Sequence, residues 1–282
     1  MSRLVGKVII TTGGTQGVGE AVALDAAREG AAGVVLCGRQ KDKGNAVAAT
    51  IEELGCQAEY VKADLASEED CRNVVRRCDE KFGRVDGLVN AAADTHRGTL
   101  ENTTVEFWDR QFAINVRAPF LLCQEAVAIM RREKIAGSIV NIQSVASYCG
   151  LPFLVSYSCT KGALNTLTKN LANTLRHDRI RVNGINLGWT DTPAEHVVQR
   201  LQGAPDNWLE LGEKASPFDR LLKADDVGKL CSFLLSDDSG ILTGSNMDYS
   251  QRVVGVFPPE PSGEEVAGWD AVPGGVLPVE GL

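Results

Sequence analysis

Short apolar runs alternate with longer segments of helical periodicity along the chain, up to about residue 250. The runs are rich in Val, Ile and Leu, as is typical of strands that are buried on both faces of a sheet. We predict strands over residues 8–10, 34–37, 58–61, 87–89, 138–142, 180–185 and 246–249. We predict helices over residues 17–29, 41–54, 67–82, 104–132, 156–176 and 225–235. The apolar helix 104–132 is expected to bend at Pro119.

This alternation predicts parallel strands joined by crossover helices that cover both faces of the sheet. We therefore expect an α/β protein with one doubly wound parallel sheet, in a single domain over residues 1–255. Within it, prolines and glycines surround short helical pieces in residues 190–216, which favours a lid over a pocket. Prolines recur in the tail 256–282, which is either disordered or, as we favour, an extended arm.

Composition excludes several functional classes. The formal net charge of −8 argues against a broad surface for nucleic acid. The N-terminus has no apolar stretch like that of a signal peptide, and no uninterrupted apolar run is long enough to span a bilayer. The eight cysteines form no Cys-x-x-Cys pair, so they fit small buried side chains in a reducing compartment rather than a metal site. We expect a cytoplasmic protein that binds no metal, nucleic acid or membrane.

A glycine-rich turn, residues 12–19, follows the first predicted strand. Glycines at such a place let the backbone approach a pyrophosphate, and the N-terminus of the next helix stabilises the negative charge. The spacing differs from the common G-x-G-x-x-G fingerprint, and a plain tight turn is the alternative. The expected dinucleotide contacts in this turn are Gly13, Thr15, Gln16, Gly17, Val18 and Gly19.

The end of the second strand bears on the choice of cofactor, because it normally meets the adenosine ribose. The chain has no carboxylate there but has Arg39, whose planar fork suits a 2′-phosphate. This favours NADP(H) over NAD(H); the alternative is that Arg39 stacks on adenine or stays solvated. Asp64 and Leu65 follow the third strand and could cap the adenine edge, although Asp64 could equally be a turn residue.

Tyr157 and Lys161 lie four residues apart on one face of the predicted helix 156–176. A free tyrosine has a pKa of about 10, too high for base chemistry at neutral pH, and a nearby ammonium lowers that pKa. The other donors of the lysine can hold a ribose. Ser144 follows the strand 138–142 and can present its hydroxyl to a substrate oxygen. The set predicts proton transfer coupled to hydride transfer between a nicotinamide and an alcohol or carbonyl.

The glycine turn, Asn115, Ser144 and Tyr157-x-x-x-Lys161 resemble the motifs of the classical short-chain dehydrogenase/reductase family, over about residues 5–250. The resemblance implies a Rossmann-type fold and an NAD(P)(H)-dependent oxidoreductase. It implies that Tyr157 is the general acid/base, that Lys161 lowers the pKa of Tyr157 and holds the ribose, and that Ser144 orients the substrate. It also implies that Asn115 sits at a helix irregularity and supports a proton relay. An ordinary polar helix residue is the alternative for Asn115.

Two further segments resemble the family with substitutions. Residues 90–93 are similar to its Asn-Asn-Ala-Gly segment, and residues 187–192 to its Pro-Gly-x-x-x-Thr stretch. The resemblance implies cofactor contacts from Asn90, Ala91, Ala92, Gly188, Thr190 and Thr192. It also implies a homotetramer or homodimer in which helices 104–132 and 156–176 pack across subunits. The substitutions leave one alternative, a nicotinamide-binding sensor or assembly protein with vestigial catalysis. An epimerase or dehydratase is disfavoured, because such enzymes usually have a larger C-terminal substrate domain than the residues after Thr192 can form.

The substrate pocket should be lined by segments that follow the strands. The candidates are Thr95, His96, Gln143, Ala146, Tyr148, Phe153, Asn186 and Trp189. This mixture of aromatic and polar side chains suits a hydroxylated molecule, such as a sugar or polyol, better than a bare lipid. Among the candidates His96 titrates near neutral pH, and a loop histidine with satisfied partners is favoured over a catalytic one.

Overall fold

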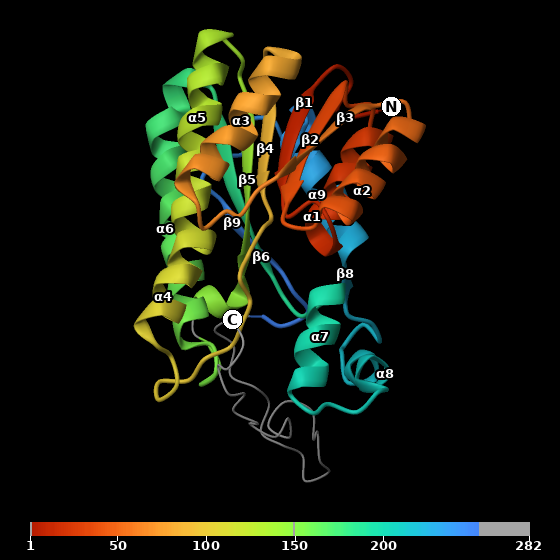
Figure 1. Cartoon of the computed structure of the whole chain (residues 1–282), viewed down its shortest axis with the longest axis vertical. Helices are drawn as coiled ribbons and strands as arrows, with labels where there is room; N and C mark the ends of the chain where they lie inside the picture. Colours follow the sequence, from red (N-terminus) through yellow and green to blue (C-terminus); the bar gives the residue numbers. More distant parts are fainter. Residues whose placement is uncertain (1, 149, 254–282) are drawn as a thin grey trace.

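The computed structural model describes residues 2–148 and 150–253, which form an α/β domain around one parallel sheet (Figure 1). Its helices and strands in chain order are β1 (Val8–Thr12), α1 (Gly17–Arg28), β2 (Gly33–Gly38), α2 (Lys41–Glu53), β3 (Gln57–Lys62), α3 (Glu68–Phe82), β4 (Gly87–Asn90), α4 (Val105–Phe112), α5 (Ala118–Arg132), β5 (Ser138–Ser144), α6 (Val155–Leu175), β6 (Arg181–Leu187), β7 (Thr190–Asp191), α7 (Pro193–Leu201), α8 (Trp208–Lys214), β8 (Leu222–Lys223), α9 (Ala224–Leu235) and β9 (Asn246–Tyr249). The predicted arm 256–282 lies outside the described residues.

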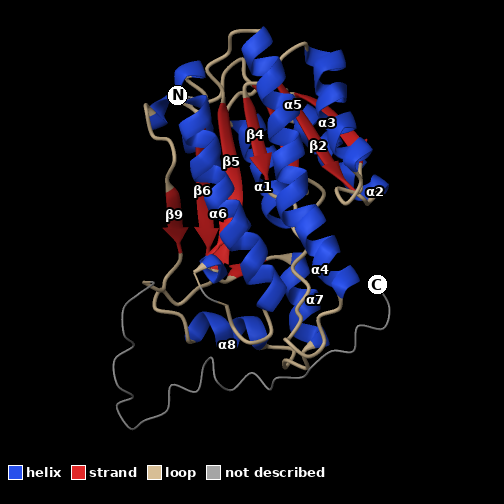
Figure 2. Cartoon of the chain, turned by 90° about the vertical axis from the view of Figure 1, so that its left-hand side faces the viewer, coloured by secondary structure: helices blue, strands red, loops and turns tan. Residues whose placement is uncertain are grey.

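The main sheet has seven parallel strands in the order β3-β2-β1-β4-β5-β6-β9, which confirms the predicted doubly wound arrangement. The strand order reverses between β1 and β4, and a crevice at such a point is where doubly wound folds bind ligands. Helices cover both faces, with α1 packed against α2 and α9 on one face and α3 against α5 on the other. Figure 2 shows α7 and α8 beyond the arrowheads of β5 and β6, at the carboxyl ends of the strands.

The apolar runs form strands because both faces of the sheet are covered. Ile9 and Ile10 are neighbours in β1 and are both fully buried, but they belong to the cores on opposite faces. Successive side chains of a strand point to opposite faces, so a strand buried on both sides needs an unbroken apolar run. Ile10 lies opposite Val35 of β2 and Leu88 of β4, which fixes the register at the centre of the sheet.

The expected single helix 104–132 is two α-helices joined by a π-helical turn, Ala113–Arg117. The irregularity therefore precedes Pro119, which lies near the start of α5. By length and composition the stretch Val105–Arg132 could cross a membrane, but 61% of its most apolar window is buried within the fold. This stretch thus belongs to the core, where α5 packs against α3 and the sheet.

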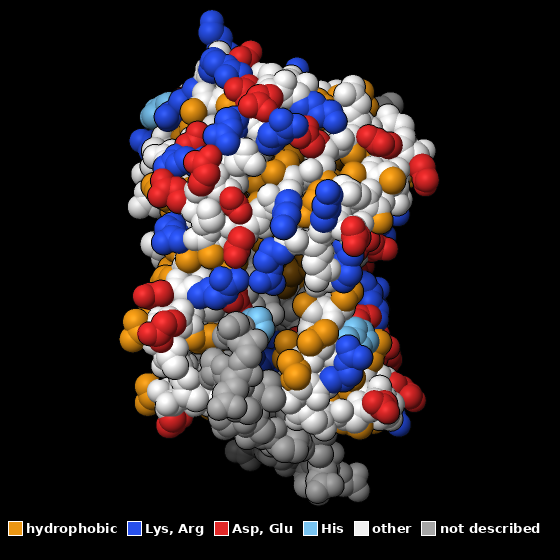
Figure 3. All heavy atoms as spheres, in the orientation of Figure 1, with side chains coloured by type: hydrophobic (Ala, Val, Ile, Leu, Met, Phe, Trp, Pro, Cys, Tyr) orange, Lys and Arg blue, Asp and Glu red, His pale blue; other side chains and the backbone are white. Residues whose placement is uncertain are grey.

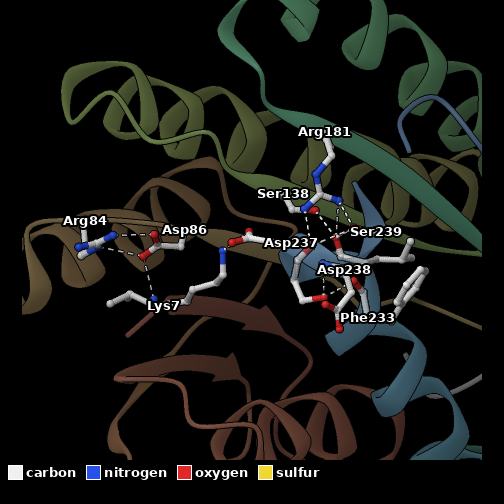
Figure 4. A network of polar contacts seen from close by, with 12 residues as sticks. Lys7, Arg84, Asp86, Ser138, Arg181, Phe233, Asp237, Asp238 and Ser239 are labelled. Carbon is white, nitrogen blue, oxygen red and sulfur yellow. Dashed lines mark hydrogen bonds and ion pairs between the residues drawn. The ribbon is translucent and has the colours of Figure 1, made fainter. Parts of the chain in front are cut away.

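A polar network closes the end of the sheet that lies opposite the carboxyl ends of its strands (Figure 4). The Asp86 carboxylate accepts hydrogen bonds from the backbone of Val8 and from Arg84. Arg181, at the start of β6, donates to the carbonyl oxygens of Leu234 and Ser236 at the end of α9. These bonds fix the starts of β1, β4 and β6.

Residues 190–216 contain α7 and α8, as the proline and glycine positions indicated. Trp208 anchors them, because its ring lies 5.7 Å from that of Trp189 and 4.8 Å from that of His196. The pair β7 and β8 was not predicted, since strands of two residues leave no periodic signal. The role of this segment as a lid stays a prediction.

Candidate functional site

A cleft of about 1320 Å³ lies at the carboxyl ends of the strands, beside the reversal point of the sheet. The predicted cofactor residues that line it are Gly13, Thr15, Gln16, Gly17, Val18, Gly19, Arg39, Asp64, Leu65, Ala91, Ala92, Tyr157, Lys161, Gly188, Thr190 and Thr192. Asn90 does not line the cleft: it is 2% exposed, and its amide donates to Asn141 Oδ1 at 2.8 Å. Asn90 is the last residue of β4, one residue beyond the predicted strand, and its side chain is buried beside the neighbouring strand β5.

The glycine turn has a geometry that only glycine permits. Gly13 and Gly17 have φ values of +66° and +60°, in the left-handed region. A side chain at Gly19 would place its Cβ 2.3 Å from Gly13 O, inside the turn itself. No side chain caps the N-terminus of α1, whose N-cap residue is Gln16. Its first backbone N–H groups therefore lack a capping partner, and this cradle fits a pyrophosphate.

Thr12 is a further residue of this cradle that was not assigned from the sequence. Its hydroxyl accepts hydrogen bonds from the backbone N–H groups of Ala91 and Ala92, both at 3.0 Å. A Cβ at Gly13 would approach Ala92 Cα to 2.9 Å, so the two segments are packed backbone to backbone. The alanines after β4 thus form a tightly held floor under the middle of the cleft.

The end of the cleft near β2 is cationic. Arg39 is exposed, and among the described residues it takes part in none of the ion pairs. Arg110 lies 3.8 Å from Asp64 and 3.9 Å from Asp94. Arg39 and Arg110 both act to lower the pKa of His96, so the three groups are close in space. Figure 3 shows basic side chains gathered around the hollow in the middle of this face.

Tyr157 lies in the first turn of α6 and lines the cleft. Burial raises the pKa of its phenol to about 12; a hydrogen bond with Ser144 and the charge of Arg97 act to lower it, and Glu195 acts to raise it. Ser144 ends β5, two residues beyond the predicted strand, and its Oγ accepts from Ala146 N at 3.1 Å. The structure therefore brings Ser144 and Tyr157 together as expected, with the phenol protonated at neutral pH.

Lys161 is 2% exposed, and its Nζ donates to Ile142 O at 2.9 Å. Burial lowers the pKa of this ammonium to about 8. Its Nζ lies 5.6 Å from the centre of the Tyr157 ring, and the expected lowering of the Tyr157 pKa by Lys161 stays a prediction. Burial is the largest influence on the pKa of each of the two groups.

Asn115 occupies the π-helical turn, so the helix irregularity implied by the resemblance is present. Its Oδ1 accepts from Asp94 N at 2.7 Å, and its Nδ2 donates to Asp94 O and Thr160 Oγ1. The side chain is 1% exposed and does not line the cleft. It joins the segment after β4 to α6, while its part in a proton relay stays a prediction.

The predicted substrate residues divide into two groups. Six of them line the cleft, namely Thr95, His96, Gln143, Ala146, Phe153 and Trp189. Tyr148 and Asn186 do not, because both hydrogen bond to the Asp248 carboxylate of β9. His96 Nδ1 lies 2.6 Å from Asp94 Oδ1, and this hydrogen bond is the main cause of the raised pKa of the histidine. His96 thus has the satisfied loop partner that the sequence favoured.

Arg97 and Glu195 are charged cleft residues that sequence reasoning missed. Arg97 belongs to the loop after β4 and Glu195 to the first turn of α7. They form an ion pair across 98 positions of sequence. The neighbouring residues in the sequence cannot predict this ion pair, because the pair forms only when the segment after β6 folds back over the cleft.

Comparisons with known proteins agree with this geometry. The family model described as Enoyl-(Acyl carrier protein) reductase matches residues 13–250. An uncharacterized oxidoreductase from Methylorubrum extorquens is 36% identical over 90% of this chain and 100% of its own length. An NADP-dependent (R)-specific alcohol dehydrogenase from Lentilactobacillus kefiri is 31% identical over 86% of this chain and 94% of its own.

A solved structure from Sinorhizobium meliloti 1021, assigned as a short-chain alcohol dehydrogenase, has a TM-score of 0.81 with this chain. The two are 29% identical, and the match covers 88% of this chain and 96% of that one. The glycine cradle and the Ser144–Tyr157–Lys161 set lie in the matched part. The chain belongs to the classical short-chain dehydrogenase/reductase family and is a nicotinamide-dependent oxidoreductase of alcohols or carbonyls.

Proposed function

We propose that this enzyme uses NADP(H) and that Tyr157 is the group that transfers the proton. The observation that carries the proposal is the position of Ser144, Tyr157 and Lys161 in one cleft with the uncapped start of α1. The nicotinamide supplies or accepts the hydride when it is bound. Hydroxylated small molecules suit the cleft, because its wall mixes polar and aromatic side chains.

Each residue has a distinct part in the proposed reaction. The protonated phenol of Tyr157 donates its proton to a carbonyl oxygen during reduction, and in the reverse direction the phenolate takes a proton from the alcohol. The hydroxyl of Ser144 donates to the same substrate oxygen and fixes its position. Lys161 holds the cofactor ribose through its ammonium, whose pKa of about 8 keeps a large fraction charged at neutral pH.

The preference for NADP(H) rests on Arg39. Its guanidinium is exposed at the end of β2, where a 2′-phosphate would be bound, and the Lentilactobacillus relative is named as NADP-dependent. The remaining cofactor contacts are those of the cleft wall given above. A preference of the wild type for NAD(H) would contradict this assignment.

We also propose that the enzyme is a cytoplasmic homotetramer or homodimer. Val105 of α4 and Phe120 of α5 are 71% and 44% exposed, so the helices expected at a subunit interface carry apolar surface. Light scattering on the purified protein measures the subunit number. A monomeric mass would contradict the proposal.

The experiment that tests the function is nicotinamide absorbance with each cofactor against polyols, sugars, hydroxy acids, steroids and ketones. Turnover that is lost in Tyr157→Phe, while that variant still binds the cofactor, would support the proposal. Turnover that survives the substitution would contradict the role of Tyr157. An absence of turnover with every compound would contradict the proposed substrate range.

A further inference from the structure

Arg97 and Glu195 meet across the substrate end of the cleft. Arg97 Nη2 lies 3.2 Å from Glu195 Oε1, and the two side chains are only 19% and 17% exposed. Both residues line the cleft together with Tyr157. An ion pair this far out of solvent, in a binding cleft, is expected to contact whatever enters.

The arginine is held by its own wall of the cleft. Next to it, His96 O accepts from Gln111 Nε2 at 2.8 Å, and Gly98 N donates to Phe153 O at 3.0 Å. The guanidinium carbon lies 5.1 Å from the centre of the Phe153 ring. The guanidinium also donates from Nη1 to Gln202 Oε1 at 2.5 Å, so contacts with Phe153 and with the residue after α7 orient it besides the bond to Glu195.

The glutamate is oriented by the opposite wall. Its Oε1 accepts from Arg97, from Trp189 Nε1 at 2.9 Å and from Gln199 Nε2 at 2.6 Å. All three bonds end on this one oxygen. Oε2 takes none of them, so the carboxylate keeps acceptor capacity for a group inside the cleft.

The pair lines the same cleft as Tyr157 and acts on its phenol through charge. Arg97 and Glu195 both act on the Tyr157 phenol, in opposite directions, which places both charges within electrostatic reach of it. A substrate whose oxygen meets Tyr157 would therefore extend its next few atoms toward the pair. Those atoms displace water from the pair, so they should offer a donor to the carboxylate and an acceptor to the guanidinium in its place.

We propose that Arg97 and Glu195 form a subsite for the additional hydroxyl groups of a neutral polyhydroxylated substrate, a sugar or sugar alcohol. This inference rests on the proposed oxidoreductase function. A hydroxyl both donates and accepts, so two neighbouring hydroxyls satisfy Glu195 Oε2 and the guanidinium together without separating the pair. An apolar alcohol would desolvate the pair without such compensation. An anionic substrate would have to compete with Glu195 for Arg97 and would then face a like charge.

The test compares kcat/KM for sorbitol, cyclohexanol and 3-hydroxybutyrate in the wild type and in Glu195→Gln. Glutamine keeps the size and one oxygen acceptor but removes the charge. We expect the ratio of kcat/KM for sorbitol to that for cyclohexanol to fall at least about tenfold, the worth of one charge-assisted hydrogen bond. The ratio is the measured quantity because any change in the pKa of Tyr157 affects both substrates. Glu210→Gln, an exposed α8 residue outside the cleft wall, is the control and should leave the ratio unchanged.

A second variant, Arg97→Lys, tests the subsite independently, in case Glu195→Gln disturbs the local structure. Arg97→Lys keeps the positive charge but loses the planar fork, so the same ratio should fall. An unchanged ratio in both variants would overturn the inference. A kcat/KM for 3-hydroxybutyrate above that for sorbitol in the wild type would also overturn it, because the intact pair would then favour an anion. These outcomes are distinct from a failure of the proposed function, which is tested with cyclohexanol and Tyr157→Phe. Turnover of cyclohexanol that is lost in Tyr157→Phe would support the proposed function, and turnover that survives in that variant would refute it.

Discussion

Lys161 Nζ donates a 2.9 Å hydrogen bond to the carbonyl oxygen of Ile142 and so ties α6 to β5. The bond joins the helix that carries Tyr157 to the strand that ends at Ser144. The positions of the phenol and the hydroxyl are therefore set by buried backbone contacts. The two groups to which we assign the proton transfer and the positioning of the substrate are therefore preorganised before any substrate enters.

Tyr157→Phe should lower kcat by at least about 100-fold, the usual contribution of a positioned general acid. Phenylalanine keeps the ring and its packing but has no proton to transfer. The dissociation constant for NADPH, measured by fluorescence, should change little, because the glycine cradle is untouched. Tyr148→Phe is the control: Tyr148 bonds to Asp248 and does not line the cleft, so its loss should leave kcat near the wild-type value.

Arg39→Asp should shift the enzyme from NADP(H) toward NAD(H). The ratio of kcat/KM for the two cofactors should fall by at least about tenfold, since a charge-assisted hydrogen bond to the 2′-phosphate is worth about 1.5–3 kcal/mol. The aspartate can accept from a ribose 2′-hydroxyl instead. Arg28→Asp makes the same change of charge at the exposed far end of α1 and should not alter the ratio. An equal effect of both variants would show a general electrostatic effect.

The sequence predicted the sheet and the cradle because both depend on local rules. Ile9 and Ile10 are both apolar because consecutive strand residues face the two cores on opposite sides of the sheet. Gly19 is a glycine because no Cβ fits at its position in the turn. The sequence failed where side chains meet over long separations. The side chain of Asn90 bonds to Asn141, and Arg97 pairs with Glu195 of α7. Neither contact can be predicted from the neighbouring residues in the sequence. Burial also raises the pKa of Tyr157, and no sequence motif reports how deeply a side chain is buried.

Gly19→Ala should destabilise the fold by about 1–3 kcal/mol and weaken cofactor binding, because the added methyl group would overlap Gly13 O. Thermal unfolding and NADPH titration measure the two effects. Gly162→Ala is the matched control within α6, where the nearest atom, Ser147 O, is at an ordinary 3.5 Å. That substitution should stabilise the helix by about 0.5–1 kcal/mol. A neutral result for Gly19→Ala would show that the turn relaxes more easily than its contacts indicate.

The ion pair of His96 and Asp94 should make stability depend on pH. The hydrogen bond to Asp94 raises the pKa of His96 above its ordinary value, and it prevails over desolvation and the charges of Arg39 and Arg110, which oppose it. A raised pKa in the folded state stabilises the fold below the unfolded pKa of about 6.5, and the gain disappears as pH rises through the folded value. The histidine is 54% exposed, so screening keeps the effect small.

The free energy of unfolding of the wild type, minus that of His96→Gln, should therefore be larger at about pH 5.5 than at about pH 9. Urea titrations at the two pH values measure this difference. His177→Gln removes an exposed histidine outside the cleft and is the matched control for the loss of an imidazole. Asp94→Asn should abolish the dependence at His96, because the amide cannot hold the imidazolium by charge. A difference for His96→Gln that grows with pH would mean that the neutral imidazole is the form the fold stabilises.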